Sequence, residues 1–239
     1  LLYLDHGEFK MSEHVIAYYD VMMSDPIIAE HHGGSGYFNV GYWTKNTTNA
    51  REACDQMMDA LLDMVSLQRN ARVLDVACGM GATSEFLAER FGPQSVVGIN
   101  VAASQLQKAR VRVPAATFIE MDATALRFPD GLFDLVICVE AAFHFDTREA
   151  FFREAYRVLR PDGCILLADA LFTAEHKIHP RGNILASTQA YRDLLTQVGF
   201  REVQLREVTE NSWYAYFDSL LNWVSIKRAA GELSDAYVD

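Results

Sequence analysis

The sequence contains little cysteine, little proline and no long apolar run. Its 239 residues include six prolines and four cysteines, which are Cys54, Cys78, Cys138 and Cys164. No two cysteines form a CxxC pair, so the pattern favours free thiols in a reducing compartment. No apolar segment approaches the roughly 20 residues that span a bilayer. Residues 1–10 lack the basic and apolar regions of a secretory signal, so we expect a cytoplasmic protein without membrane contact.

Basic side chains are also scarce. The chain has 21 lysines and arginines against 32 acidic residues, which gives a net charge of −11. Binding to nucleic acid or to an anionic membrane requires a basic surface that neutralises phosphates. The charge balance therefore disfavours both partners and favours a small-molecule ligand.

Apolar runs alternate with helical patterns over most of the chain. Strands are predicted at residues 73–77, 95–101, 116–122, 133–139, 164–170 and 202–207, and helices at 82–91, 104–111, 148–159, 188–198 and 213–230. This alternation predicts an α/β fold with a Rossmann-like, mostly parallel sheet and helices on both faces. No segment before Asp239 has the pattern of a further strand.

The first 70 residues have a different pattern. Helices are predicted at 13–24 and 48–67, on either side of a segment rich in glycine and aromatic residues at 31–43. We predict that residues 1–70 form a helical cap or lid and that residues 71–239 form the ligand-binding domain. Phe38, Tyr42 and Trp43 are candidates to close the pocket, with ordinary packing of the cap as the alternative.

The segment ARVLDVACGMGATS, residues 71–84, is the most informative part of the chain. A buried strand carrying Asp75 leads to Gly79 and Gly81 and then to a helix. This is the start of a nucleotide-binding βα unit, because glycine lets a ligand approach the backbone closely. A parallel sheet binds its ligand at the carboxyl ends of its strands. Polar residues follow the later strands at those ends: Asn100, Asp122, Glu140, His144 and Asp169.

Two cofactors compete for this site. A dinucleotide fingerprint requires G-x-G-x-x-G and an acid after the second strand, but Ser84 replaces the third glycine and Asn100 the acid. S-adenosylmethionine needs an acid near the glycine turn, a group for its ribose hydroxyls and an acid for its adenine amine. Asp75, Asn100 and Asp122 occupy those places in chain order, so we expect S-adenosylmethionine. A role for Asp75 in tying the glycine turn is compatible with this expectation.

Four motifs together carry a family resemblance. LDVACGMG, GINVAASQL, MDATALRFPDGLFDLV and EAYRVLRPDG resemble the class I S-adenosylmethionine-dependent methyltransferases. The resemblance implies a seven-stranded sheet, cofactor contacts from Gly79 and Gly81, a ribose contact from Asn100, and an adenine contact from Asp122 with the Ala123 backbone. The cofactor-binding residues that we predict are Tyr18, Tyr19, Asp75, Ala77, Cys78, Gly79, Gly81, Asn100, Val101, Gln105, Asp122, Ala123 and Glu140.

A narrower resemblance involves YFNVGYW, residues 37–43, and EAAFHFDTREAFFREAYRVLRPDG, residues 140–163. These segments are similar to small-molecule methyltransferases of natural-product pathways, including the enzymes that O-methylate macrolide sugars. The resemblance implies methyl transfer to a small secondary metabolite at a hydroxyl. The alternatives are methylation of carbon or nitrogen in a terpenoid, quinone or amine, and a cofactor-binding module whose catalysis is lost or altered.

Methylation of a hydroxyl benefits from a base, because a hydroxyl is a weak nucleophile at neutral pH. His144 follows the fourth strand, where the transferred methyl group should emerge, and an unperturbed imidazole titrates at about pH 6.5. We predict His144 as the base and Asp169, after the neighbouring strand, as the carboxylate that orients it. Glu140 is a third catalytic candidate, because its carboxylate would stabilise positive charge during C-methylation. Packing for His144 and capping for Asp169 are the structural alternatives.

Two other groups of residues have alternative explanations. Aromatic residues between 213 and 223 predict an apolar acceptor pocket, a homo-oligomer contact or a buried helix. His31 and His32 share no metal-binding motif with His176 and His179, so no metal site is expected.

Overall fold

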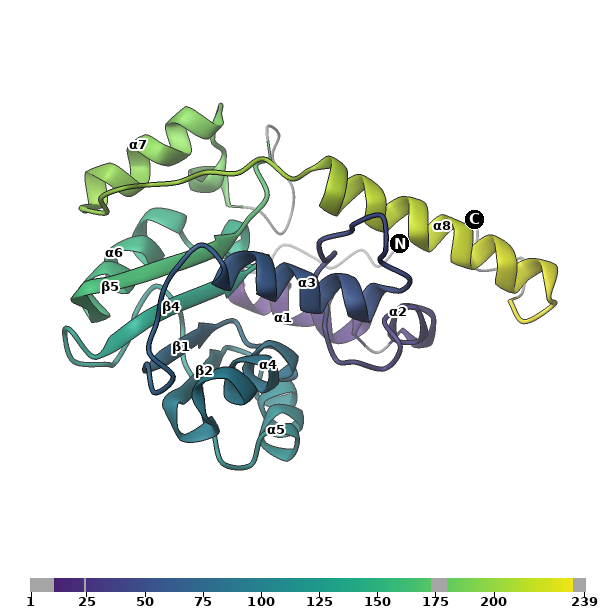
Figure 1. The fold of residues 1–239 in the computed structure, drawn as a ribbon, viewed down its shortest axis with the longest axis horizontal. Coiled ribbons are helices and arrows are strands. Elements are labelled where there is room, and N and C mark those ends of the chain that lie inside the picture. The colour runs from purple at the N-terminus through teal and green to yellow at the C-terminus, as the bar shows by residue number, and fades with distance from the viewer. Residues whose placement is uncertain (1–10, 24, 173–179, 234–239) are drawn as a thin grey trace.

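The computed structural model describes residues 11–23, 25–172 and 180–233. Five parallel strands form one sheet in the order β3-β2-β1-β4-β5 (Figure 1). The strands are β1 (Val73–Val76), β2 (Val96–Asn100), β3 (Thr117–Glu120), β4 (Phe133–Val139) and β5 (Leu159–Ala168). The strand order reverses between β1 and β4, which is where open parallel sheets bind their ligands.

Helices cover both faces of this sheet. The helices α3 (Ala50–Leu62), α4 (Ala82–Phe91) and α5 (Ala103–Arg112) pack on one face, and α6 (Arg148–Val158) and α7 (Thr188–Val198) pack on the other. Leu135 and Ile137 join the first core, whereas Val136 and Cys138 join the second. Successive side chains of a strand point to opposite faces, so β4 contributes to both cores. The predicted α/β fold with a Rossmann-like sheet is confirmed.

The N-terminal region contains α1 (Met11–Met22) and α2 (Pro26–His31) before α3. Met57, Met58 and Leu61 of α3 are buried in one core with Val73 and Leu135 of the sheet. Although α3 lies within the predicted cap, it therefore packs as part of the body of the sheet. The division of the chain at residue 70 stays a prediction.

Two strands differ from the sequence predictions. β5 begins at Leu159, so Pro161 and Gly163 lie within a strand and do not precede it. Proline is tolerated there because β5 is an edge strand of the described sheet. The strand predicted at 202–207 is not formed: the segment runs beside α7, with Val203 against the core and its carbonyl bonded by Arg192. The described sheet accordingly has five strands, not the seven that the resemblance implies.

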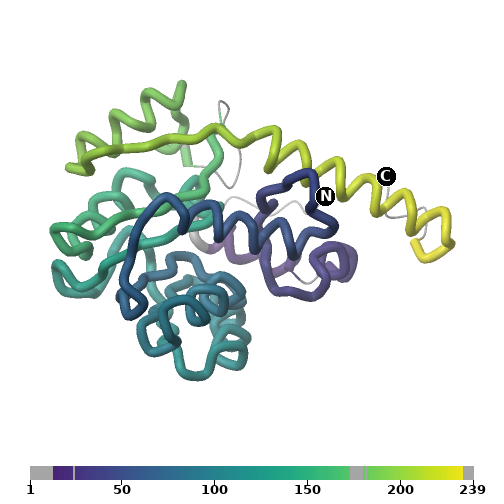
Figure 2. The backbone as a smooth tube through the Cα atoms, in the orientation of Figure 1, coloured from purple at the N-terminus to yellow at the C-terminus, as the bar shows by residue number. Residues whose placement is uncertain are grey.

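The C-terminal helix α8 (Ala215–Ala229) follows a short π-helical turn, η4 (Glu210–Tyr214). Figure 2 shows α8 passing α2 and projecting from the body of the molecule. Trp43 and Asn211 join η4 to the loop before α3, since the Trp43 N–H donates to the Asn211 carbonyl at 2.6 Å. No helix in the described part of the chain is long and apolar enough to cross a membrane.

Candidate active site

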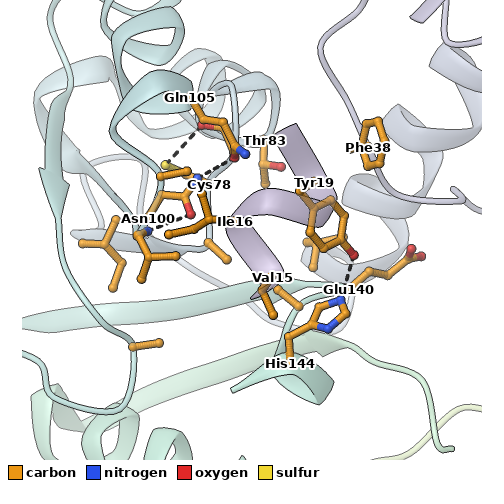
Figure 3. A pocket seen from close by; sticks show the side chains of 18 of the residues that line it. Val15, Ile16, Tyr19, Phe38, Cys78, Thr83, Asn100, Gln105, Glu140 and His144 are labelled. Carbon is orange, nitrogen blue, oxygen red and sulfur yellow. Dashed lines mark hydrogen bonds between the residues drawn. The ribbon is translucent and has the colours of Figure 1, made fainter. Parts of the chain in front are cut away.

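A cavity of about 390 Å³ lies at the carboxyl ends of the strands, with α1 along one side (Figure 3). Its floor comes from the residues that follow β1, β2, β3 and β4, and Val15, Ile16 and Tyr19 contribute from α1. Ten of the predicted cofactor-binding residues line it, namely Tyr19, Ala77, Cys78, Gly79, Asn100, Val101, Gln105, Asp122, Ala123 and Glu140. The sheet therefore brings together groups that are far apart in the sequence.

The two glycines of the turn have different roles. Gly79 has a φ of 52°, and a side-chain carbon there would lie 3.7 Å from Met23 Cε and 3.9 Å from Gln105 Oε1, in ordinary contact. Its backbone faces the cavity and can approach a ligand. Gly81 does not line the cavity; a side-chain carbon there would lie 2.9 Å from Ala109 Cα. The predicted cofactor contact of Gly81 stays a prediction, and in the structure this glycine allows α4 to pack closely on α5.

Asp75 lies beneath the glycine turn and does not line the cavity. Its side chain is 1% exposed, and its Oδ2 accepts a hydrogen bond of 2.6 Å from Ser84 Oγ. Burial raises the pKa of Asp75 to about 7, although the Ser84 hydrogen bond acts in the opposite direction. Asp75 ties β1 to α4, so its contribution to the cofactor site is support of the turn.

The ribose and adenine candidates are held by local hydrogen bonds. Asn100 donates from Nδ2 to Gln105 Oε1 at 2.8 Å and accepts from the Val101 N–H at 2.8 Å, so its amide is fixed at the cavity wall. Asp122 Oδ1 accepts from the Thr124 N–H and hydroxyl, both at 2.8 Å. Its other carboxylate oxygen has no partner among the described residues, and Asp122 lines the cavity.

The adjacent tyrosines of α1 point in different directions. Tyr19 lines the cavity, and its hydroxyl lies 2.7 Å from His144 Nε2 (Figure 3). Tyr18 is 41% exposed and lies outside the cavity lining, so the structure adds no support to its predicted cofactor contact. Burial, followed by Tyr18 and Glu140, raises the pKa of Tyr19. The Tyr19 phenol therefore stays protonated at neutral pH.

His144 ends the 3-10 turn η2 (Ala142–His144) and is 6% exposed. Asn183 holds this turn, because its Nδ2 donates to the carbonyls of Phe143 at 3.1 Å and Phe145 at 2.6 Å. These carbonyls flank His144 in the chain. No sequence motif points to Asn183, and its role follows only from the contact between distant segments.

Asp169 is not the partner of His144. Its Oδ2 accepts from Arg148 Nε at 2.7 Å and from the Tyr191 hydroxyl at 2.8 Å, and its Oδ1 accepts from the Ala170 N–H at 2.9 Å. The prediction that Asp169 orients His144 is wrong, because the arginine that begins α6 binds this carboxylate. Asp169 instead joins α6 and α7 to the end of β5.

Glu140 connects the cavity to the loop before α3. Its Oε2 accepts from the Val40 N–H at 3.0 Å, and its own N–H donates to the Ala168 carbonyl at 2.7 Å. Burial raises the pKa of Glu140 to about 7, against the effect of the Val40 hydrogen bond.

Of the three residues expected to close the pocket, Phe38 lines the cavity, whereas Tyr42 and Trp43 do not.

The lining matches the charge of S-adenosylmethionine. This cofactor carries a sulfonium, an ammonium and a carboxylate, so it is net positive, and the lining includes the acids Asp122, Glu140 and Asp146. The exposed backbone at Gly79 and the fixed amide of Asn100 supply polar groups along the cavity. The residues therefore fit the cofactor. The described residues contain no cluster of three or more histidine, cysteine or acidic side chains that could hold a metal ion.

Known proteins that are similar to this chain are methyltransferases, which agrees with a cavity for S-adenosylmethionine. A family model described as "Methyltransferase domain" matches residues 73–163. Over 224 residues the chain is 27% identical to erythromycin 3''-O-methyltransferase of Saccharopolyspora erythraea, an alignment that covers 82% of this chain and 73% of that enzyme. These matches support the class I S-adenosylmethionine-dependent methyltransferase family for this chain, and residues 73–163 carry the methyltransferase domain. Its cofactor is accordingly S-adenosylmethionine.

Two further proteins show how far the likeness extends. The methyltransferase is 34% identical to 27-O-demethylrifamycin SV methyltransferase of Amycolatopsis mediterranei over 137 residues, which are 55% of this chain and 50% of that one. It therefore spans about half the length of that relative. The crystal structure of the [4+2]-cyclase SpnF matches with a TM-score of 0.73 at 23% identity, over 88% of this chain and 82% of that one. This second likeness concerns the fold.

Proposed function

We propose that this methyltransferase transfers the methyl group of S-adenosylmethionine to a hydroxyl of a small secondary metabolite. The contact between Tyr19 and His144 at 2.7 Å carries the proposal, because it places a base within the cavity. A hydroxyl must lose its proton during methylation, so a base within hydrogen-bond reach assists the reaction. The erythromycin and rifamycin relatives, which are named for O-methylation, support oxygen as the acceptor atom.

The proposed proton path uses Tyr19 and His144. When bound, S-adenosylmethionine supplies an electrophilic methyl group on a positively charged sulfur. If His144 carries its proton on Nδ1, the Tyr19 hydroxyl donates to Nε2 and keeps oxygen lone pairs for the acceptor. As the methyl group leaves the cofactor sulfur for the acceptor oxygen, the acceptor proton would pass to Tyr19 and the Tyr19 proton to His144.

The remaining predicted residues position the cofactor in this proposal. Asn100 and Asp122 face its nucleoside, and the backbone of Ala77, Cys78 and Gly79 faces its amino-acid end. Holding the methyl carbon in line with the acceptor oxygen lowers the barrier to methyl transfer. We assign the activity to the cytoplasm, since the cysteines are free thiols.

The test combines turnover with cofactor binding. We expect release of S-adenosylhomocysteine and a mass gain of one methyl substituent on at least one compound in a panel of glycosides and phenols. His144→Ala should lower turnover by roughly 10²–10⁴-fold, as expected for loss of a general base, with S-adenosylhomocysteine affinity unchanged in calorimetry. Full turnover in His144→Ala, or a product methylated on carbon or nitrogen, would contradict the proposal.

A further inference from the structure

His32 is a buried histidine whose two ring nitrogens both face carbonyl oxygens. It is the C-cap residue of α2 and is 3% exposed. Its Nδ1 lies 3.0 Å from the Ile28 carbonyl oxygen, and its Nε2 lies 3.2 Å from the Asn39 carbonyl oxygen. A carbonyl oxygen only accepts hydrogen bonds, so both nitrogens must donate. A neutral imidazole has one N–H group, and this geometry therefore requires the imidazolium, which has two.

The surroundings of His32 offset part of the cost of this buried charge. Burial disfavours a charged side chain, whereas hydrogen bonds from an ionised donor are roughly twice as strong as neutral ones. The ring centroids of Tyr216 and Phe38 lie 5.6 Å and 6.1 Å from that of His32, and the Phe38 ring is inclined to it by only 11°. Aromatic faces attract cations at about this distance. Two carbonyls and two rings thus favour the imidazolium.

The adjacent His31 has no such pair of acceptors. Its Nδ1 is buried with no hydrogen-bond partner in the described part of the chain, and its Nε2 lies 3.4 Å from Ser219 Oγ. Burial, followed by the charge of His32, lowers the pKa of His31 to about 4. His31 is therefore neutral at neutral pH, which leaves His32 as the member of this histidine pair that carries the charge.

The Asn39 carbonyl belongs to a segment that borders the cavity. Phe38 and Asn39 line the cavity. The ring centroid of Phe38 lies 5.7 Å from that of Tyr19, whose side chain points toward the same cavity (Figure 3). At the other end of the segment, the Val40 N–H donates to Glu140 Oε2 at 3.0 Å. The residues on either side of the Asn39 carbonyl therefore contact Tyr19 and Glu140.

His32 does not line the cavity, so it acts on the site through this segment. We infer that His32 is a positioning residue: its imidazolium donates to the Asn39 carbonyl, holds residues 38–40 against the cavity, and releases them when it gives a proton to solvent. The remaining lone pair then faces a carbonyl oxygen, so the link between α2 and the segment weakens whichever nitrogen gives up its proton. The link is therefore present at low pH and lost as the pH rises. The inference rests on the proposed function only for the catalytic role of Tyr19.

Other ionisable groups lie on the elements packed around this link. They are His31 and Glu30 of α2, Tyr216 and Lys227 of α8, Cys54 of α3, and Glu140. Burial raises the pKa of Tyr216 and that of Cys54, whose Sγ donates to the same carbonyl at 3.4 Å, so both stay protonated at neutral pH. Burial raises the pKa of Glu140 to about 7, so its carboxylate forms as the pH rises. Glu140 therefore acts in the opposite direction to His32.

The variants His32→Gln and His31→Gln separate these contributions. Glutamine keeps an amide donor at either position but does not titrate. Calorimetry gives the dissociation constant of S-adenosylhomocysteine for wild type and both variants between about pH 5.5 and about pH 9, a range that spans the titration of an ordinary imidazole. Each variant is compared with wild type at the same pH. Because all three proteins retain Glu140, Cys54 and Tyr216, the contributions of those groups cancel in the ratio.

The expected result is a ratio that depends on pH for one variant alone. Wild type should bind S-adenosylhomocysteine about tenfold more tightly than His32→Gln at about pH 5.5, and less than about twofold more tightly at about pH 9, because a charge-assisted hydrogen bond has been lost. His31→Gln should match wild type within about twofold throughout, because its neutral ring contacts His32 and α8. A ratio for His32→Gln that is independent of pH, or an equal dependence in His31→Gln, would overturn the inference.

NMR of wild type with isotope-labelled histidine supplies a readout that does not depend on the folding of a variant. Both ring nitrogens of His32 should carry hydrogen at about pH 5.5, and one should lose it by about pH 9, together with a shift of the Asn39 and Val40 amide signals. A His32 ring with the same protonation throughout, or a titration that leaves these amides unchanged, would overturn the inference. No measurement here uses turnover, so a protein that methylates no hydroxyl would fail the proposed function and leave the role of His32 supported.

Discussion

Arg148 and Asp169 form a buried ion pair in which Arg148 Nε donates to Asp169 Oδ2 at 2.7 Å, and their side chains are 1% and 5% exposed. Arg148 also donates to the carbonyls of Asn183 and Ala170, and its own N–H donates to Asn183 Oδ1 at 2.6 Å. Since Asn183 holds the turn that carries His144, this ion pair connects the interior of the protein to the candidate base.

We expect Arg148→Ala to destabilise the protein by about 3–5 kcal/mol, because it leaves a buried carboxylate without its partner. Arg153→Ala on the same helix is the matched control. Arg153 forms an exposed pair with Glu149, so its loss should cost less than about 0.5 kcal/mol. Urea denaturation of both variants measures the difference. Similar midpoints would show that the buried pair does not stabilise the fold.

Tyr19→Phe should reduce turnover while leaving the fold unchanged. The variant keeps the ring contacts with Phe38 and His144 but loses the hydroxyl that lies 2.7 Å from Nε2. We expect a loss of roughly 10–100-fold in kcat, because the hydroxyl belongs to the proposed proton path. Tyr18→Phe is the control on the adjacent, exposed residue and should retain wild-type kcat. Equal kcat values in the two variants would remove Tyr19 from the mechanism.

Gly79→Ala should weaken cofactor binding. The added carbon would face the cavity within 4 Å of Met23 and Gln105 and would occupy space at the glycine turn. We expect a rise of roughly tenfold in the dissociation constant of S-adenosylhomocysteine and a stability cost of about 1–2 kcal/mol from the positive φ. Gly92→Ala is the control: it also has a positive φ, with no atom within 4 Å of the added carbon. It should show the stability cost alone, so a comparable loss of affinity in Gly92→Ala would contradict this prediction.

Asp75→Asn should change how stability depends on pH. The pKa of Asp75 is about 7 in the folded protein against an ordinary value of 3.8, so the folded state favours the protonated acid. This acid therefore stabilises the fold below about pH 4, and the contribution is lost as the pH rises through about 7. An amide at the same position stays uncharged throughout. The variant should therefore gain stability relative to wild type between about pH 4 and pH 8, by on the order of 4 kcal/mol.

Urea denaturation at several pH values measures this difference directly. Asp122→Asn is a suitable control, because Asp122 is an exposed carboxylate at the cavity. It should give a nearly constant difference from wild type over the same range. A constant difference for Asp75→Asn as well would show that the buried acid does not titrate as proposed.

The strands and the glycine turn could be predicted because runs of apolar residues and closely spaced glycines are visible within a few consecutive residues. Continuous apolar runs mark β1, β2 and β4, whose central residues are buried from both sides. The segment at 202–207 has strand-like composition but no partner strand in the described sheet, and pairing cannot be inferred from one segment. The strand predicted at 164–170 in fact begins at Leu159, because an edge position accommodates Pro161 and Gly163.

By itself, the sequence determined the fold class, the cofactor and the end of the sheet at which the cofactor is expected, because hydrophobic periodicity and the glycine turn are encoded by neighbouring residues. Only the tertiary structure decided which side chains meet there. Tyr19 and His144 are separated by 125 positions and Arg148 and Asp169 by 21, yet each pair is joined by hydrogen bonds. Those contacts depend on how the helices pack against the sheet. Packing brings Arg148, and not His144, within hydrogen-bond reach of the Asp169 carboxylate.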